Sequence, residues 1–188
     1  MCIYGLGIRM IIEQDIRGER VILSQYYEKD ISKEYLSWLS DKEINRFLEV
    51  RFTEYSETLA KEYVKFCIQS PNIYFLKIIS SKGDFIGTCT ITYNENHRTA
   101  EIGLMLGDKD FHNKGIGTEV IGLLTRFCCS NLSSRKITAG LYVNNVGSLR
   151  AFLKNGFAIE ARLGSQVLLE GESVDVYRLA FFCRQRLL

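Results

Sequence analysis

A loop with two glycines, residues 111–118, carries the residue types best suited to hold a phosphate group. It reads Phe-His-Asn-Lys-Gly-Ile-Gly-Thr and stands between a strand-like segment and a long amphipathic helix. The first amides of a helix have no partner within it, and the helix dipole adds partial positive charge at that end. Gly115 and Gly117 leave the backbone open to a ligand. The pattern predicts a phosphate or pyrophosphate site, although an ordinary glycine-rich turn would have the same composition.

The loop does not match the two common nucleotide-binding motifs. A Rossmann fingerprint would need a third glycine or an alanine at position 120, where the chain has Val120. The sequence also contains no run that ends in Gly-Lys-Ser or Gly-Lys-Thr, as a P-loop requires. A phosphate would therefore be bound in a third way.

Glu101 is the acidic residue best suited to take a proton from a substrate. It stands in a strand-like run, residues 98–106, whose hydrophobic side chains alternate. A carboxylate there needs a cleft or a partner, and it can act as a general base or orient water. A glutamate on a solvated sheet edge is the alternative, and His97, in the preceding turn, is a second candidate base. One face of the strand would hold Ala100, Ile102, Leu104 and Leu106, and the other Glu101, Gly103 and Met105.

Residues 48–53 place an acidic, a basic and an aromatic side chain close together. Glu49 could fix an ammonium group, and Arg51 could contact a phosphate or carboxylate through two hydrogen bonds. Phe52 lies next to them in the sequence. A solvated connector would have a similar composition, so the segment is a candidate substrate-binding loop.

Helices that position these residues follow from hydrophobic periodicity and from capping residues. They are predicted at residues 31–39, at 42–48 after Asp41, at 56–69 after Ser56, from 116, and from 148 to a stop at 155–156. In the helix that begins at 116, the apolar face comprises Ile116, Val120, Leu123, Leu124 and Phe127. In the helix capped by Ser56, one face comprises Leu59, Tyr63, Phe66 and Cys67.

Strands are predicted where hydrophobic residues alternate between turn residues. The expected fold is a mixed α/β sheet with helices on both faces. The predicted strands are residues 20–24, 73–79, 85–93, 98–106, 136–143, 157–163, 166–169 and 174–183.

The order of strand, glycine loop, helix, strand, asparagine and short helix resembles the GNAT superfamily of N-acetyltransferases. His112, Gly115 and Gly117 fit its Arg/Gln-x-x-Gly-x-Gly/Ala motif, with His in the first position. Asn145 and the pair Gly156-Phe157 fit its second block. Residues 35–48 look like the first helices of the branch that contains the ribosomal-protein N-terminal acetyltransferases. The resemblance covers residues 20–183.

This resemblance implies a mostly antiparallel central sheet of about seven strands and acetyl-CoA as the acyl donor. It implies Glu101 as the base, usually through water, and a backbone N–H of Met105 or Leu106 as the donor to the thioester carbonyl. The residues that would bind the donor are Met105, Leu106, His112, Asn113, Lys114, Gly115, Ile116, Gly117, Thr118, Asn145 and Phe152.

One position departs from the family. Many members use a tyrosine to protonate the leaving thiolate, and this chain has Phe152 there. Tyr142, or water held by Asn145 or Ser148, could supply the proton, which makes Asn145 a candidate catalytic residue. A thiol with a pKa of about 8.5 is also a tolerable leaving group as the thiolate.

The function implied is acetyl-CoA-dependent transfer of an acetyl group directly to a primary amine of a small molecule. The run Leu48-Glu-Val-Arg-Phe52 looks like that of acetyltransferases of amino-sugar and surface-polysaccharide synthesis, so an amino sugar or nucleotide-linked amino sugar is the favoured acceptor. The alternatives are a protein N-terminus, a polyamine or aminoglycoside, and a non-catalytic acyl-CoA-binding protein.

Composition sets the remaining expectations. A chain of 188 residues predicts one domain, residues 1–188, with residues 1–17 as an N-terminal extension or leading strand and Met10 as a possible natural start. A net charge of +2 favours neither nucleic acid nor an anionic membrane as a partner. Monomer and homodimer both remain open.

The six cysteines form no Cys-x-x-Cys pair, and the sequence has two histidines, so no metal site is expected. Cys128 and Cys129 are expected to be small apolar core residues. Reduced thiols in a cytoplasmic protein are the simplest interpretation.

Overall fold

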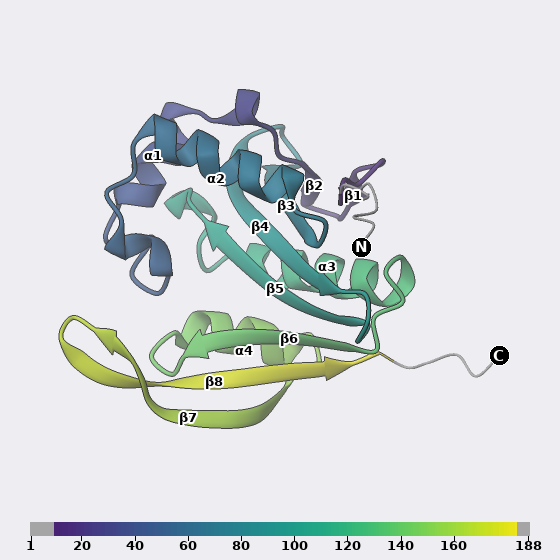
Figure 1. The fold of residues 1–188 in the computed structure, drawn as a ribbon, viewed down its shortest axis with the longest axis vertical. Helices are drawn as coiled ribbons and strands as arrows, with labels where there is room; N and C mark the ends of the chain where they lie inside the picture. Colours follow the sequence, from purple (N-terminus) through teal and green to yellow (C-terminus); the bar gives the residue numbers. More distant parts are fainter. Residues whose placement is uncertain (1–9, 184–188) are drawn as a thin grey trace, which may run out of the picture.

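An eight-stranded sheet forms the centre of the protein (Figure 1). The structure, a computed structural model, describes residues 10–183. The strand order is β1-β2-β3-β4-β5-β6-β8-β7, and every neighbouring pair is antiparallel except β5 and β6. The strands are β1 (Ile16–Arg17), β2 (Val21–Gln25), β3 (Ile73–Ser80), β4 (Phe85–Asn94), β5 (Thr99–Leu106), β6 (Lys136–Tyr142), β7 (Ala158–Leu169) and β8 (Glu172–Phe182).

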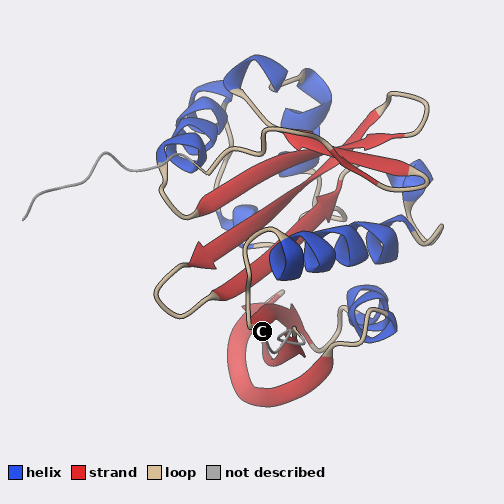
Figure 2. Cartoon of the chain, turned by 90° about the vertical axis from the view of Figure 1, so that its right-hand side faces the viewer, coloured by secondary structure: helices blue, strands red, loops and turns tan. Residues whose placement is uncertain are grey.

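Helices cover both faces of the sheet, as the sequence predicted (Figure 2). On one face lie α1 (Lys33–Ser40) and α2 (Glu57–Gln69), and on the other α3 (Ile116–Ser130) and α4 (Val146–Lys154). Short 3-10 turns occur at η1 (Glu28–Asp30), η2 (Glu49–Phe52) and η3 (Lys109–Phe111). The mixed α/β fold with a mostly antiparallel sheet is therefore confirmed, with eight strands where about seven were expected.

The alternation predicted for β5 separates two hydrophobic cores. Ala100 and Ile102 are buried in the core that also contains Val120 and Leu124 of α3. Met105 is buried in the other core, with Tyr35 and Trp38 of α1. A strand buried on both faces is held rigidly, so its end is a stable platform for a site.

The parallel strands β5 and β6 pair only along their first residues. Residues 99–101 of β5 pair with 136–138 of β6, and beyond Glu101 and Thr138 no further pairing follows. The two strands then diverge, which leaves a V-shaped opening in the middle of the sheet (Figure 1). Backbone groups along the two inner edges are left without the ladder bonds that the rest of the sheet provides.

Two predicted segments differ from the structure in the N-terminal half. Residues 42–48 form turns rather than a helix. Asp41 does cap them, because its carboxylate accepts from the amides of Glu43 and Ile44, but the Asn45 side chain donates to Leu39 C=O and folds the segment back onto α1. In α2, Ser56 caps as predicted. The buried face of α2 is Ala60, Val64 and Cys67, so Leu59, Tyr63 and Phe66 do not lie where the periodicity placed them.

At the C-terminal end, the two strands predicted at 157–163 and 166–169 are the single strand β7. Register shifts after Ile159 and Leu163 absorb the extra residues, so Gly164 and Ser165 lie in an irregularity of the strand and not in a turn. The hairpin closes at Glu170 and Gly171, both at positive φ.

Cys129 and Cys183 form a disulfide with a Cα–Cα distance of 5.6 Å. The prediction of reduced thiols is therefore wrong for this pair, because β8 returns beside β6 and brings Cys183 to the end of α3. Cys67, Cys89 and Cys128 are free and buried, and Cys128 is a core residue as expected. Cys2 lies outside the described residues, which begin at Met10. The predictions of an N-terminal extension and of a start at Met10 therefore stay predictions. No helix among residues 10–183 is long and apolar enough to cross a membrane.

Reduction of this disulfide is expected to lower the free energy of unfolding by about 2–4 kcal/mol, because the bond closes a long loop in the unfolded chain. Chemical denaturation of Cys183→Ser against wild type measures the loss. Dithiothreitol should destabilise the wild type and leave Cys183→Ser unchanged. Equal stability of the two proteins without reductant would contradict the prediction.

Candidate active site

The glycine loop forms the start of α3, next to the end of β5. Gly115 is the N-cap at a φ of 78°, a conformation that favours glycine. Helical bonding begins with Glu119 N–H to Gly115 C=O at 3.1 Å, so the amides of Ile116, Gly117 and Thr118 precede it. A ring nitrogen of His112 lies 2.8 Å from Leu106 O and fixes the loop to the strand. Free amides at a helix start are what the predicted phosphate site requires, and the site itself stays a prediction.

Arg20, the residue just before β2, supports the loop, and sequence reasoning missed it. Its guanidinium donates to the carbonyls of Lys114 and Gly115 at 2.7 and 3.2 Å and to the carboxylate of Glu119 at 2.8 Å. Burial opposes ionisation of Glu119, but the bonds from the Arg20 amide and side chain outweigh it and lower the pKa of Glu119. Arg20 precedes β2 and belongs to no motif, so the sequence held no signal for this role.

A hollow of about 350 Å³ lies beside the loop. Arg20 and Arg126 contribute the two guanidinium groups among its lining residues. Asn113 and Lys114 complete the loop, and Asn113 adopts a positive φ of 57°. The hollow also contains the carboxylates of Glu19 and Glu119, and Arg20 is bonded to Glu119, so the free amides of the helix start are the groups best placed to bind a phosphate.

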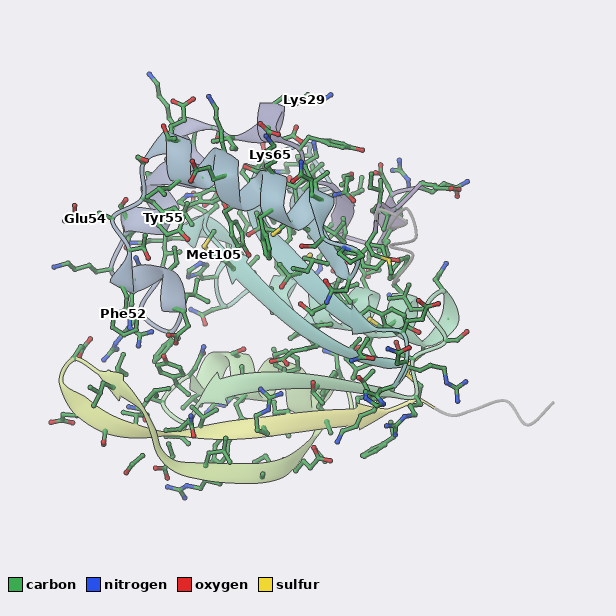
Figure 3. All side chains as sticks on the ribbon, in the orientation of Figure 1. Lys29, Phe52, Glu54, Tyr55, Lys65 and Met105 are labelled. Carbon is green, nitrogen blue, oxygen red and sulfur yellow. A yellow bond between two sulfur atoms is a disulfide. The ribbon has the colours of Figure 1, made fainter. Side chains whose placement is uncertain are left out.

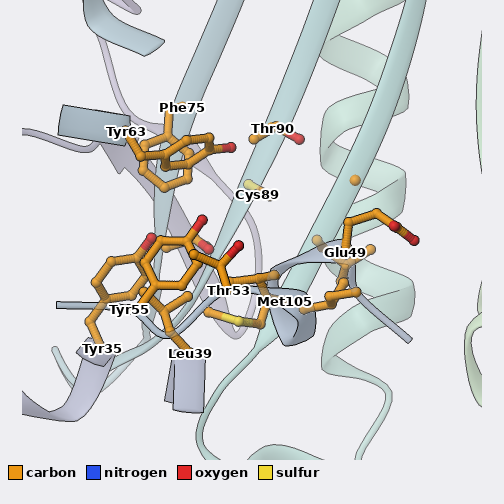
Figure 4. A pocket seen from close by; sticks show the side chains of 15 residues that line it. Tyr35, Leu39, Glu49, Thr53, Tyr55, Tyr63, Phe75, Cys89, Thr90 and Met105 are labelled. Atoms are coloured by element: carbon orange, nitrogen blue, oxygen red, sulfur yellow. The ribbon is translucent and has the colours of Figure 1, made fainter. Parts of the chain in front are cut away.

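A second, larger pocket of about 470 Å³ lies on the opposite face of the sheet, under α1, α2 and η2 (Figure 4). It reaches β5 at Gly103, Leu104 and Met105, so it opens at the diverging end of that strand. Among the described residues, no lysine or arginine lines it. The aromatic and hydroxyl groups around it come from Tyr35, Tyr55, Tyr63, Phe75, Thr53, Thr88 and Thr90.

Glu101 is the last residue of β5 that pairs with β6, where the V-shaped opening begins. Arg178 of β8 donates to both carboxylate oxygens of Glu101, at 3.1 and 3.2 Å. The residue pair crosses over Gly140 of β6, where a side chain would meet the Arg178 guanidinium. Glu101 thus faces the opening on the same side as Gly103 and Met105, but it does not line the larger pocket.

His97 and Phe152 do not join this region. His97 is exposed in the turn before β5, at the end opposite the glycine loop. Phe152 is 1% exposed, and its ring packs edge-on against Phe157 at 5.0 Å. Phe152 is therefore a core residue, and its expected contact with the donor stays a prediction. Asn145 caps α4 by accepting from the Ser148 amide at 3.2 Å.

The candidate substrate-binding loop forms η2 and crosses the mouth of the opening. Glu49 lines the larger pocket, and the hydroxyl of Tyr142 donates to its carboxylate at 2.5 Å. Arg51 donates to the Tyr142 hydroxyl and to the carbonyls of Leu48 and Leu168 at 2.8–2.9 Å. Its guanidinium is therefore engaged in hydrogen bonds within the protein and is not free to bind an acceptor.

Phe52 stacks on this guanidinium at 4.1 Å and is 67% exposed. Figure 3 shows it on the side of the β7–β8 hairpin, away from Met105 at the end of β5. The three predicted loop residues thus divide, with Glu49 in the pocket and Arg51 and Phe52 in a contact that joins η2 to the hairpin.

Comparisons with known proteins agree on one family. A family model described as an acetyltransferase (GNAT) domain matches residues 20–158. The chain is 32% identical over 133 residues to the probable N-acetyltransferase YjcK of Bacillus subtilis, covering 69% of this chain and 68% of that protein.

Two solved structures share the fold at 18% identity. One is RimL, a ribosomal L7/L12 alpha-N-protein acetyltransferase in complex with coenzyme A, with a TM-score of 0.78 over 90% of this chain and 98% of that one. The other is a spermidine N-acetyltransferase from Vibrio cholerae in complex with CoA and spermine, with a TM-score of 0.76 over 87% and 95%.

Proposed function

The chain belongs to the GNAT acetyltransferase family and is an acetyl-CoA-dependent N-acetyltransferase, and we propose that its acceptor is the primary amine of an amino sugar. The observation that carries this proposal is the larger pocket, which combines three tyrosines with three threonines. A sugar ring has a C–H face that packs on aromatic rings and hydroxyl groups that exchange hydrogen bonds with Tyr and Thr.

The pocket suits a neutral acceptor body better than a strongly charged one. Glu49 supplies the carboxylate among its lining residues, whereas a polyamine needs several carboxylates. The sequence argument for a nucleotide-linked sugar depended on Arg51, and that guanidinium is held by Leu48, Tyr142 and Leu168. We therefore assign the pocket to the amino sugar itself.

Acetyl-CoA would lie along the opening between β5 and β6, with its pyrophosphate on the amides of residues 113–118. A backbone N–H of Met105 or Leu106 would donate to the thioester oxygen as charge develops there. Glu101 would accept the ammonium proton through a water molecule, because an alkylammonium with a pKa of about 10 cannot attack a carbonyl. The neutral amine would then attack the thioester carbon directly.

Release of CoA thiol, measured against a panel of amines, tests the acceptor. The panel contains a free hexosamine, its nucleotide-linked form, short peptides and spermidine. The proposal expects the highest kcat/KM with the free or linked hexosamine. Faster acetylation of peptides or spermidine would reject the amino sugar and leave acetyl transfer standing. Acetyl-CoA binding without turnover of any amine would favour a non-catalytic acyl-CoA-binding protein.

Tyr63→Phe is expected to raise KM for the amino sugar about 3- to 10-fold with little change in kcat, the usual effect of losing one hydrogen bond. Figure 4 shows the Tyr63 hydroxyl directed toward Thr90 inside the pocket. Leu59→Ala is the matched control, because Leu59 lies one turn earlier on α2, is 40% exposed and does not line the pocket. An equal KM for Tyr63→Phe and wild type would remove Tyr63 from the acceptor site.

A further inference from the structure

We propose that Tyr142 protonates the departing CoA thiolate and that Glu49 returns a proton to Tyr142, a role that rests on the acetyl transfer proposed above. The resemblance to GNAT enzymes leaves this step open, because Phe152 stands where many members have a tyrosine. Phe152 is buried against Phe157 and has no hydroxyl, so the donor must come from elsewhere.

Tyr142 lies on the strand that borders the opening opposite β5, as a proton donor to the thiolate would have to. It is the last residue of β6, and β6 faces β5 across the V. Its hydroxyl lies 2.5 Å from the Glu49 carboxylate, and Glu49 lines the same pocket as Gly103 and Met105 of β5. Figure 4 shows the Glu49 carboxylate on the side of the pocket away from Tyr35 and Tyr55. The hydroxyl thus contacts a carboxylate of the pocket that reaches the end of β5, where the proposed acetyl transfer would place the thioester.

The hydroxyl is prepared for proton transfer by two charged neighbours. Arg51 donates to its oxygen at 2.8 Å, a bond that would stabilise the tyrosinate formed when the proton leaves. Arg51 itself cannot swing away freely, because it also holds Leu48 O and Leu168 O. Burial and the Glu49 hydrogen bond raise the pKa of Tyr142, so the group is protonated at neutral pH.

Exposure differs along the pair in the sense that a proton relay needs. Tyr142 is 7% exposed, whereas the side chain of Glu49 is 74% exposed. Glu49 can therefore exchange protons with water while it touches a phenol that water barely reaches. The pair therefore links a solvent-exposed carboxylate to a buried phenol.

The step balances as follows. When the tetrahedral intermediate collapses, the C–S bond breaks and its electron pair remains on sulfur. The Tyr142 O–H rotates from Glu49 to the sulfur and gives it the proton, which forms the CoA thiol. A proton released from the ammonium group into water then reaches Glu49 and passes to the tyrosinate. Of the two protons that the ammonium group loses, one ends on the thiol and one in solvent.

A purely structural role is the rival explanation, because the same contacts fasten η2 to the hairpin. Arg46 provides the matched control. It lies in the turns just before η2, binds both carboxylate oxygens of Glu170 at 3.0 and 3.2 Å and so ties the neighbouring segment to the same hairpin through a bond that does not involve Tyr142. Arg46→Ala removes that tie and leaves the proposed relay intact.

The first measurement is the turnover of Tyr142→Phe with an amine that the wild-type enzyme acetylates. We expect kcat to fall by about 10²-fold, the scale of a lost general acid. Acetyl-CoA affinity by calorimetry should change less than about twofold, and Arg46→Ala should keep kcat within about threefold of wild type.

The second measurement replaces Tyr142 with 3,5-difluorotyrosine, which lowers the pKa of the phenol and keeps its hydrogen bonds. A donor must be protonated, so the rate must fall as pH rises through the phenol pKa. In the wild type this fall lies above about pH 10, since the pKa is raised from that value. In the fluorinated protein it should move to lower pH. Glu49 and Arg51, the charged groups that contact the hydroxyl, are the same in both proteins.

Three results would overturn the relay. Tyr142→Phe could keep near-full kcat, which would mean that the thiolate leaves unprotonated. Arg46→Ala could lose as much activity as Tyr142→Phe, which would reduce both residues to tethers. The pH dependence of kcat could be the same in the fluorinated and wild-type proteins, which would mean that Tyr142 is not the proton donor. A wild type that releases no thiol with any amine would instead reject the proposed function itself.

Discussion

Gly117→Leu is expected to weaken acetyl-CoA binding by more than about 100-fold while the protein remains folded. Gly117 belongs to the first turn of α3, whose free amides form the expected pyrophosphate site. A leucine side chain there would extend toward Leu104 and Leu106 of β5, beside these amides, and is expected to fill space that the phosphates need. Within the protein, an added Cβ would meet only the Cδ1 atoms of Leu104 and Leu106, both at 3.7 Å, an ordinary contact.

Calorimetric titration with acetyl-CoA measures this loss, and a thermal melt checks the fold. Gly164→Leu is the control, because an added Cβ at Gly164 meets nothing within 4 Å and β7 lies on the far edge of the sheet. Unchanged affinity in folded Gly117→Leu would show that the pyrophosphate does not lie on this loop.

Glu101→Gln is expected to lower kcat about 10²-fold or more, with acetyl-CoA affinity nearly unchanged. The carboxylate lies where β5 and β6 separate, and glutamine keeps its size but cannot accept the ammonium proton. His97→Ala should retain full activity, because β5 separates His97 from the glycine loop by its whole length, about 25 Å at 3.3 Å per residue.

A profile of kcat against pH for both variants decides between the two bases. If Glu101→Gln keeps its rate and His97→Ala loses it, the base is His97. If neither variant loses rate, the amine arrives neutral or gives its proton directly to water. Arg178 is expected to matter through Glu101, since it holds both carboxylate oxygens.

Sequence reasoning succeeded where a local signal and a packing demand agreed. The alternation in β5 and the helical spacing after Gly115 each describe a face that must be buried, and both faces are buried in the structure. Ser56 and Gly115 each fix a helix start through local backbone chemistry. These features need only a few neighbouring residues, so the fold class followed from them.

Features that depend on distant partners could not be predicted in this way. Arg20 reaches Lys114, and Arg51 reaches Leu168, across about a hundred residues of sequence with no motif at either end. The burial of α2 was misjudged because its buried face consists of the small residues Ala60, Val64 and Cys67, whereas the larger apolar side chains lie on a more exposed face. The disulfide required knowledge that β8 ends beside α3.

That disulfide also divides the chain into two topologically different parts of unequal length. The covalent ring it closes, residues 129–183, contains β6, α4, β7 and β8, and so one entire wall of the V-shaped opening with Tyr142 on it. The other wall, β5 with the strands and helices before it, lies on open chain outside the ring. A segment closed by a disulfide loses less conformational entropy on folding, because its unfolded state has fewer conformations. Partial unfolding should therefore begin in the chain outside the ring. The glycine loop and the larger pocket would then lose their structure while the strands that carry Tyr142 stay folded.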